Sequence, residues 1–314
     1  MYMNELDLTI FHIVHNPMTI KDLYEKIHKE EHRNVAQKAL YTSIYRLEKQ
    51  GFITKKQQGK LILIQQSPQP VSSYLHTVLE NQPHFIKKQI LTATSLDVLL
   101  TMLHNSCTVK WMQEINQLCE RTIRRHLSKL HKAAIITKHQ EDTTLHSFTW
   151  KINTLQRELL QFLEAYEEFR ALKILESINV SATSLWVHGI EFLIRTPQPI
   201  HLKQFKETGA TALDRYGMKL LSTENVYIYT RRTLGLWDHA FLTVLSRKND
   251  TNQLRYLGYL YKKHRSNAAE FIQKGTYYDP ESMQLILDLF TQNKETPQLT
   301  IQDINELEHL YGEQ

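Results

Sequence analysis

The densest group of chemically active side chains in this sequence lies in residues 121–132, which hold five Lys and Arg residues. Guanidinium groups donate paired hydrogen bonds to phosphate or to the edge of guanine, and ammonium groups bind phosphate as point charges. A helical period of 3.6 places Ile123, Leu127 and Leu130 on one stripe and the cations opposite, where we expect no acidic residue to balance them. The pattern indicates either recognition of a polyanion or an ordinary solvated helix face.

Other candidate sites are weaker. His28 and His32 stand at i and i+4 in "HKEEH", a spacing that could hold a metal, but there is no HExxH order and no third ligand, so we expect a solvated turn and no metal. Cys107 and Cys119 have no CxxC spacing, and we expect both to be small core residues of a reducing compartment. The sequence has no P-loop, no dinucleotide fingerprint and no nucleophile elbow, so no cofactor is expected.

The cationic stretch belongs to an internal repeat. "KALYTSIYRLEKQGFITK" (38–55) and "RTIRRHLSKLHKAAIITK" (121–138) align without gaps at a shift of 83. Upstream, residues 6–16 resemble 96–105 and residues 19–23 resemble 108–112, with a longer connection in the first copy. Each copy is predicted to contain a helix, a short helix, a third helix and two strands. The strands are expected at 52–56 and 61–65, around a turn with Gly59, and at 135–139 and 146–152.

Both copies resemble the winged helix-turn-helix domains of prokaryotic transcription regulators. The resemblance rests on the third helix with its ending, "LEKQGFI" and "LHKAAII", and covers about residues 5–66 and 95–153. The second copy departs from the pattern at Ala134, where glycine is usual. The implied fold class is α+β and mainly helical. The expected organisation is winged helix 1 (1–66), a linker with a helix (67–94), winged helix 2 (95–153), a linker or dimerisation helix (154–178) and a C-terminal α+β domain (179–314).

The resemblance implies that each third helix enters the major groove of double-stranded DNA and that each wing contacts the backbone. In the second copy we expect base contacts from Arg121, Thr122, Arg124, Arg125 and Ser128, and phosphate contacts from Lys129, Lys132, Lys138 and His139. In the first copy we expect contacts from Asn34, Gln37, Lys38, Tyr41, Thr42, Tyr45 and Arg46, with Lys55, Lys56 and Lys60 on the wing. The first copy could instead be a protein-interaction module.

Composition agrees with this organisation. A chain of 314 residues, 41% hydrophobic and 23% charged, is expected to form two or three globular domains. No apolar run reaches the length of a membrane span, and acids occupy the N-terminus where a signal peptide would carry cations, so a cytoplasmic protein is expected. The net charge is +3 over residues 1–66, +4 over 67–153 and −2 over the remainder. The basic surplus therefore lies in the first half.

The helix predicted over residues 154–177 carries a heptad-like seam. Its members are Leu155, Leu159, Phe162, Tyr166 and Phe169. Such a seam could pair with a second copy in a homodimer or pack on the chain's own domains.

From residue 181 onward, strands are expected in 184–196 and 225–232, followed by helices in 236–247, 253–264, 267–275 and 280–293. This layout is similar to the nucleotidyltransferase-like domains that accompany winged helices in some prokaryotic regulators and abortive-infection-type antitoxins. The Gly-Ser turn and the paired Asp residues that such catalysis needs are missing, so we expect no enzymatic activity. Gly189 is expected to be a tight backbone position.

The leading hypothesis is a sequence-specific DNA-binding transcription regulator whose C-terminal domain binds a partner or drives oligomerisation. The alternatives are a plasmid or viral replication initiator, and a DNA-binding antitoxin or chromosome-associated scaffold whose domains bind protein.

Overall fold

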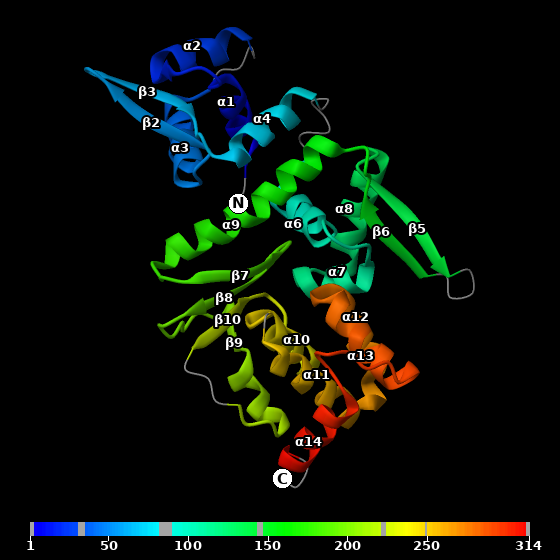
Figure 1. The fold of residues 1–314 in the computed structure, drawn as a ribbon. Helices are drawn as coiled ribbons and strands as arrows, with labels where there is room; N and C mark the ends of the chain where they lie inside the picture. The colour runs from blue at the N-terminus through cyan, green and yellow to red at the C-terminus, as the bar shows by residue number, and fades with distance from the viewer. Residues whose placement is uncertain are drawn as a thin grey trace. The chain divides into compact units, whose positions relative to one another are not determined.

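The computed structural model of the chain describes residues 3–30, 35–81, 90–142, 147–220, 224–248 and 250–311. The fold is α+β and mainly helical, as predicted (Figure 1). Two compact units are present: the first comprises residues 1–177 and 188–190, and the second comprises residues 178–187 and 191–314. The division at Ser177 falls next to the predicted start of the C-terminal domain. Both copies of the repeat share the first unit with the helix that follows them.

The first copy of the repeat contains three helices and a three-stranded antiparallel sheet. Its elements are α1 (Glu5–Ile13), β1 (Met18–Thr19), α2 (Ile20–Glu30), α3 (Gln37–Lys49), β2 (Ile53–Gln58) and β3 (Leu61–Gln66). The sheet order is β1-β3-β2. At the β2–β3 turn Gly59 has a φ of 60°, a left-handed conformation that glycine adopts without steric cost. The predicted β-wing is therefore present in the first copy.

The second copy repeats this order after the connecting helix α4 (Pro70–Asn81). Its elements are α6 (Ala93–Thr101), β4 (Cys107–Thr108), α7 (Val109–Asn116), α8 (Glu120–Lys132), β5 (Ile136–Asp142) and β6 (Ser147–Ile152), with sheet order β4-β6-β5. The helices α3 and α8 have the same length of 13 residues, and both of their ends differ by 83 in number. The gapless alignment is therefore confirmed, although β5 runs three residues beyond its predicted end.

The apolar stripes predicted for the two third helices are buried. Leu40, Ile44 and Leu47 face the interior from α3, and their counterparts Ile123, Leu127 and Leu130 do so from α8. Each helix contacts the first helix of its own copy. The remaining inward position is polar in both copies, Ser43 and His126, and His126 Nδ1 lies 2.9 Å from the hydroxyl of Ser95.

The turn into each wing uses one left-handed residue. In the first copy this residue is Gly51, with φ 79°, and in the second it is Ala134, with φ 56°. The methyl group of Ala134 is exposed, and its carbonyl accepts a hydrogen bond of 3.1 Å from the side-chain amide of Asn153. The turn into the second wing therefore keeps its left-handed conformation although alanine replaces the usual glycine, and the Cβ of Ala134 adds a local steric cost.

Four of the five residues of the heptad-like seam lie on α9 (Arg157–Ile178), in the first unit. Leu159 and Phe162 are fully buried, Tyr166 is 3% exposed, and the ring of Phe169 packs edge-on against Phe52 at 5.5 Å. Leu155 precedes the helix and is 80% exposed. Of the two interpretations of this seam, these contacts support packing on the chain's own domains, because Leu159, Phe162 and Tyr166 are already buried there.

The second unit combines a four-stranded antiparallel sheet with a group of helices (Figure 1). Its strands are β7 (Thr183–His188), β8 (Glu191–Thr196), β9 (Phe205–Thr208) and β10 (Asn225–Tyr229), in the order β7-β8-β10-β9. Its helices are η1 (Ala210–Tyr216), α10 (Leu236–Ser246), α11 (Thr251–Lys263), η2 (Arg265–Asn267), α12 (Ala268–Tyr278), α13 (Pro280–Gln292) and α14 (Ile301–Tyr311). The central helix α10 is buried from Trp237 to Ser246. The sequence predicts α10 to α13 but not β9, η1 or α14.

A buried ionic network lies in the core of the second unit. Arg232 Nη1 donates to Asp238 Oδ1 at 2.6 Å, and its Nε donates to Glu191 Oε1 at 3.1 Å. Lys274 Nζ lies 3.3 Å from Asp238, and the hydroxyl of Tyr278 donates to the same carboxylate. Burial alone would raise the pKa of Asp238, but Arg232 and Lys274 hold it below its ordinary value. The network therefore carries charge inside the core, where each carboxylate is matched by a cation.

Gly189 is a tight backbone position, as predicted. It belongs to the first unit, has a φ of 63°, and a Cβ atom there would lie 2.4 Å from the carbonyl oxygen of Leu100. Its amide donates to Glu167 Oε2 at 2.6 Å, and the same carboxylate contacts His104 Nε2 at 2.8 Å on its other oxygen.

Within the described ranges, no helix is long and apolar enough to cross a membrane.

Candidate nucleic-acid interface

The outer face of α8 is a surface of exposed cations. Since Ile123, His126, Leu127 and Leu130 face inward, the helical period places Arg121, Arg125, Ser128 and Lys132 at the centre of the opposite face. All four are exposed. Among the residues that the structure describes, no ion pair joins these three cations to a carboxylate. The cationic face predicted for this helix is therefore present, and its central charges are exposed.

The two edges of this face differ from the prediction. Arg124 lies on one edge, and its Nε is 2.6 Å from Glu120 Oε1, so the expectation of no balancing acid is wrong. The cause is the i, i+4 spacing, with Glu120 standing one residue before the stretch. The pair is exposed and weak, so a phosphate can compete for Arg124. On the other edge Lys129 is exposed, whereas Thr122 is half-buried and its hydroxyl lies 3.2 Å from Cys119 Sγ.

The two cysteines occupy different environments, which corrects the expectation that both are core residues. Cys107 is buried, and burial raises its pKa to about 12. Cys119 is exposed at the N-cap position of α8, where hydrogen bonding with Thr122 lowers its pKa. The free backbone amides at the start of a helix make such a position polar, and the sequence spacing alone does not reveal it.

The two wing residues of the second copy that were predicted to contact phosphate, Lys138 and His139, lie on opposite faces of the wing. Lys138 pairs across the strands with Trp150, and its ammonium lies 3.5 Å from the centre of the Phe148 ring. Successive strand residues point to opposite faces, so His139 points away from Lys138 and lies 2.8 Å from the Thr137 hydroxyl. Trp150 packs edge-on against His131 of α8 at 5.6 Å. Lys138 is therefore on the face of the wing next to α8, and His139 is on the other.

His131 and Phe148 extend this surface, although sequence analysis did not select them. His131 is exposed on the Arg124 edge of α8, and its Nδ1 lies 3.1 Å from the carbonyl oxygen of Ile136 at the start of the wing. Its spacing of seven residues from Arg124 was the available signal. Phe148 is 36% exposed.

The third helix of the first copy presents a less charged face. Gln37, Lys38 and Thr42 are exposed, as are Tyr41 at 47% and Tyr45 at 62%. Asn34 lies outside the described residues. The alignment places Lys49 opposite Lys132, and Lys49 is also exposed, so the same shift of 83 could have identified it.

Two of the predicted cations in the first copy have internal partners. Arg46 Nε lies 3.4 Å from the buried Asp7 carboxylate, whose pKa is raised by burial and lowered in part by Arg46. Lys55 pairs with Glu48, which occupies the position of His131. Lys56 and Lys60 are exposed on the wing. The first copy therefore offers fewer available cations than the second.

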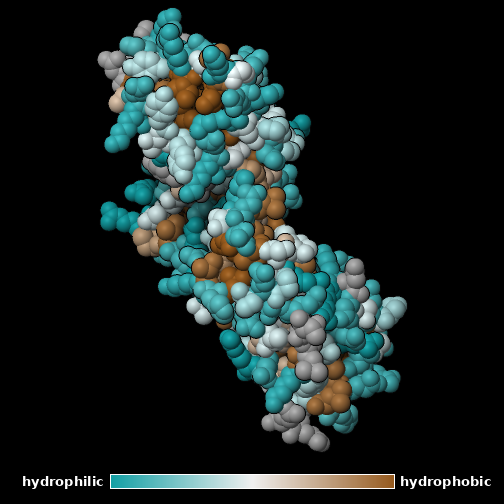
Figure 2. All heavy atoms as spheres, turned by 90° about the vertical axis from the view of Figure 1, so that its left-hand side faces the viewer, coloured by the Kyte–Doolittle hydropathy of each residue, from teal (hydrophilic) through white to brown (hydrophobic). Residues whose placement is uncertain are grey.

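The wing of the first copy carries exposed apolar side chains in place of that charge. Leu61 is 57% exposed and Ile62 is 53% exposed, both on β3. Figure 2 shows a hydrophobic patch near the top of the view, at the height of β2 and β3 in Figure 1, with hydrophilic residues around it. Such side chains suit contact with protein at least as well as contact with phosphate.

The histidine pair considered for a metal is not assembled into a site by the described residues. His28 is exposed on α2, and His32 lies outside the described ranges. Across those ranges, no group of three or more His, Cys, Asp or Glu side chains is placed to hold a metal ion.

We compared the chain with protein families, curated proteins and solved structures. No protein-family model matches the chain, no curated protein is significantly similar to it, and no solved structure matches it.

Proposed function

We propose that the protein is a sequence-specific DNA-binding transcription regulator and that the second copy of the repeat reads the DNA. The observation that carries the proposal is the exposed outer face of α8, where Arg121, Arg125 and Lys132 stand free of acidic partners among the described residues. A face with this charge would attract the phosphate backbone and release its counterions.

The dimensions of α8 suit the major groove. Thirteen residues span about 20 Å, and a helix with its side chains is about 10–12 Å across, close to the width of the groove. Arg121 and Arg125 stand in the N-terminal half of the helix and are assigned to base edges, where an arginine can pair with guanine. Lys129 and Lys132 are assigned to phosphates. Lys138 extends the phosphate contacts from the wing.

The first copy is assigned a supporting role. Its third helix carries Lys38 and Lys49 on the outer face, but Arg46 is directed to the buried carboxylate of Asp7. On the wing, Lys55 pairs with the partly exposed carboxylate of Glu48. Tyr41 and Tyr45, together with the apolar wing strand, favour contact with protein or with the sugar-phosphate backbone. Equivalent substitutions in the two copies therefore test this division of labour directly.

The test measures binding of the full chain to two labelled duplexes, one from the region upstream of its own coding sequence and one of random sequence. Fluorescence anisotropy at several salt concentrations gives the affinity and its salt dependence. We expect tighter binding to the upstream duplex at physiological salt. Equal affinity for both duplexes there would remove sequence specificity from the proposal.

Single variants then identify the face. Arg125→Ala is expected to weaken specific binding by about 1–3 kcal/mol, whereas Lys132→Ala is expected to weaken binding to both duplexes and to reduce the salt slope by about 1. Arg265→Ala is the matched control, because it removes the same charge from an exposed site in the second unit. Arg121→Ala is expected to cost more than Lys38→Ala, its counterpart in the first copy. Unchanged binding in Arg121→Ala and Arg125→Ala would refute the assignment to α8.

Mapping the DNA sites bound in cells separates this function from the two alternatives. Sites at promoters support regulation, and repeated sites at one replication origin would indicate an initiator. An absence of sites would favour a scaffold that binds protein.

A further inference from the structure

A pocket lined by three cationic side chains lies in the second unit, apart from the helix α8 that is assigned to DNA. It has a volume of about 700 Å³, within the range of small-molecule sites. Its walls come from β7, β8, Glu224 next to β10, the end of α10 and three residues that follow it. The lining residues are Leu185, Arg195, Glu224, Leu245, Ser246, Arg247, Lys248 and Asp250.

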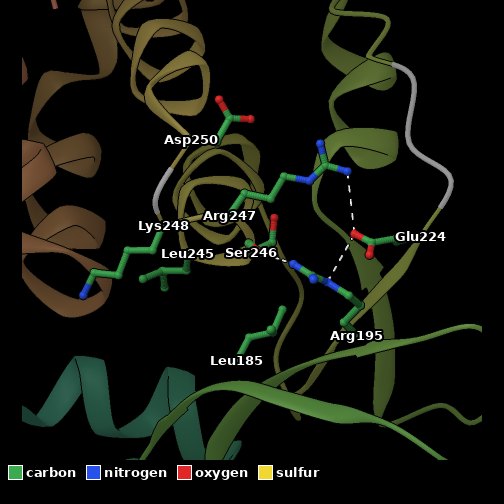
Figure 3. A pocket seen from close by; sticks show the side chains of 8 residues that line it. All are labelled: Leu185, Arg195, Glu224, Leu245, Ser246, Arg247, Lys248 and Asp250. Atoms are coloured by element: carbon green, nitrogen blue, oxygen red, sulfur yellow. Dashed lines mark hydrogen bonds and ion pairs between the residues drawn. The ribbon is translucent and has the colours of Figure 1, made fainter. Parts of the chain in front are cut away.

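Two arginines in the pocket share one carboxylate. Arg195 Nε lies 3.2 Å from Glu224 Oε2, and Arg247 Nη2 lies 3.6 Å from the same oxygen. Figure 3 shows the two guanidinium groups approaching Glu224 from different sides, with Lys248 directed away from them. The Nε of Arg195 is buried and, despite its ion pair, makes no hydrogen bond to the described residues. One oxygen of the Glu224 carboxylate therefore faces two guanidinium groups, each of which could donate a pair of hydrogen bonds.

The arginines differ in how they are held. Arg195 Nη2 donates to the carbonyl oxygen of Ser246 at 2.6 Å, so its guanidinium is fixed in the wall. The side chain of Arg247 is 39% exposed and that of Glu224 is 37% exposed, so both can reorient. A group with more acceptor oxygens than a carboxylate could replace Glu224 and satisfy both guanidinium groups. Phosphate has this chemistry, and it carries the charge that two arginines favour.

We propose that Arg195 and Arg247 form a binding site for the phosphate group of a small organic ligand, with Glu224 as the internal anion that the ligand displaces. The ligand's body would lie against Leu185 and Leu245, the apolar part of the lining. When the ligand displaces Glu224, the charged lining residues that remain are the cations Arg195, Arg247 and Lys248 and one acid, Asp250. This inference is independent of the DNA-binding proposal.

Calorimetric titration of the full chain with inorganic phosphate, AMP and adenosine tests the site. Saturable binding of phosphate is expected, with AMP binding at least tenfold more tightly and adenosine not binding. If AMP binds no more tightly than phosphate, the organic body is refuted and the ligand is the free anion. If neither anion binds saturably, the site itself is refuted.

Three variants give the result a distinctive signature. Arg247→Ala, whose one described ion pair is with Glu224, is expected to weaken phosphate binding at least tenfold. Glu224→Gln is expected to strengthen it several-fold, because the competing charge is gone. Arg215→Ala, an exposed arginine of the same unit outside the pocket, is expected to leave binding unchanged. Unaltered binding in Arg247→Ala, or weaker binding in Glu224→Gln, would overturn the proposal.

Discussion

Replacement of Ala134 by glycine is expected to stabilise the second wing. Ala134 holds a left-handed φ of 56°, which costs a residue with a Cβ about 1–2 kcal/mol. Glycine avoids this cost but loses about 0.4–1 kcal/mol more conformational entropy on folding. The exposed methyl group contributes no core packing, and the hydrogen bond to the Ala134 carbonyl is kept. The balance predicts a gain of about 0.5–1 kcal/mol.

Hydrogen exchange of the Ile135 amide measures this gain locally. That amide donates to the Leu130 carbonyl oxygen at 3.0 Å, across the turn. The predicted stabilisation slows its exchange by about two- to fivefold if the turn opens locally. Ala133→Gly is the matched control, because Ala133 has a φ of −85° and is 9% exposed. The same substitution there is expected to destabilise by about 0.5–1 kcal/mol.

The first copy supplies the reverse experiment. Gly51 occupies the equivalent turn, and a Cβ atom there would lie 2.8 Å from Lys173 Cε and 3.0 Å from Phe169 Cζ. Gly51→Ala combines backbone strain with this crowding, so a loss of about 1–3 kcal/mol is expected. A destabilising Ala134→Gly, or a neutral Gly51→Ala, would show that the two turns do not share the left-handed conformation.

Three further predictions concern the cores of the two units. Burial and the nearby His104 lower the pKa of His188 to about 3. As the pH falls, this imidazole therefore binds a proton in the unfolded chain before it does so in the folded chain. The free energy of unfolding of the first unit should fall by up to about 1.4 kcal/mol per pH unit below about pH 6.5, and His188→Asn should flatten that dependence in urea unfolding. Phe162→Ala should destabilise the first unit by about 3–5 kcal/mol, whereas Leu155→Ala should have little effect, and sedimentation should show the same mass for both if the seam is internal. Arg232→Met should destabilise the second unit by about 3–5 kcal/mol in thermal unfolding, because two buried carboxylates lose their shared partner; an unchanged melting temperature would contradict that role.

Much of the first unit was predictable because its signals are local. The spacing of Leu40, Ile44 and Leu47 follows the helical period, and the same spacing in residues 123–130 identifies the same element a second time. Gly59 between two apolar runs predicts the first wing for a similar reason. In the second unit, α10 to α13 were found from their patterns, whereas the short β9 and the 3-10 helix η1 carry too few residues for a period to appear.

Sequence alone thus determined which helix faces are apolar, which are cationic and that the arrangement occurs twice, because chain geometry converts spacing into direction. Which of these charges are available depends instead on the packing of distant segments. Arg46 is directed to Asp7, far away in sequence, while Arg125 is left exposed. This packing also places Phe162 inside its own chain, and it assembles the pocket around Glu224 from separate strands and a helix end. The physical reason is that the energy of a charge or an apolar face depends on what lies against it, and that neighbour is chosen by packing between distant segments.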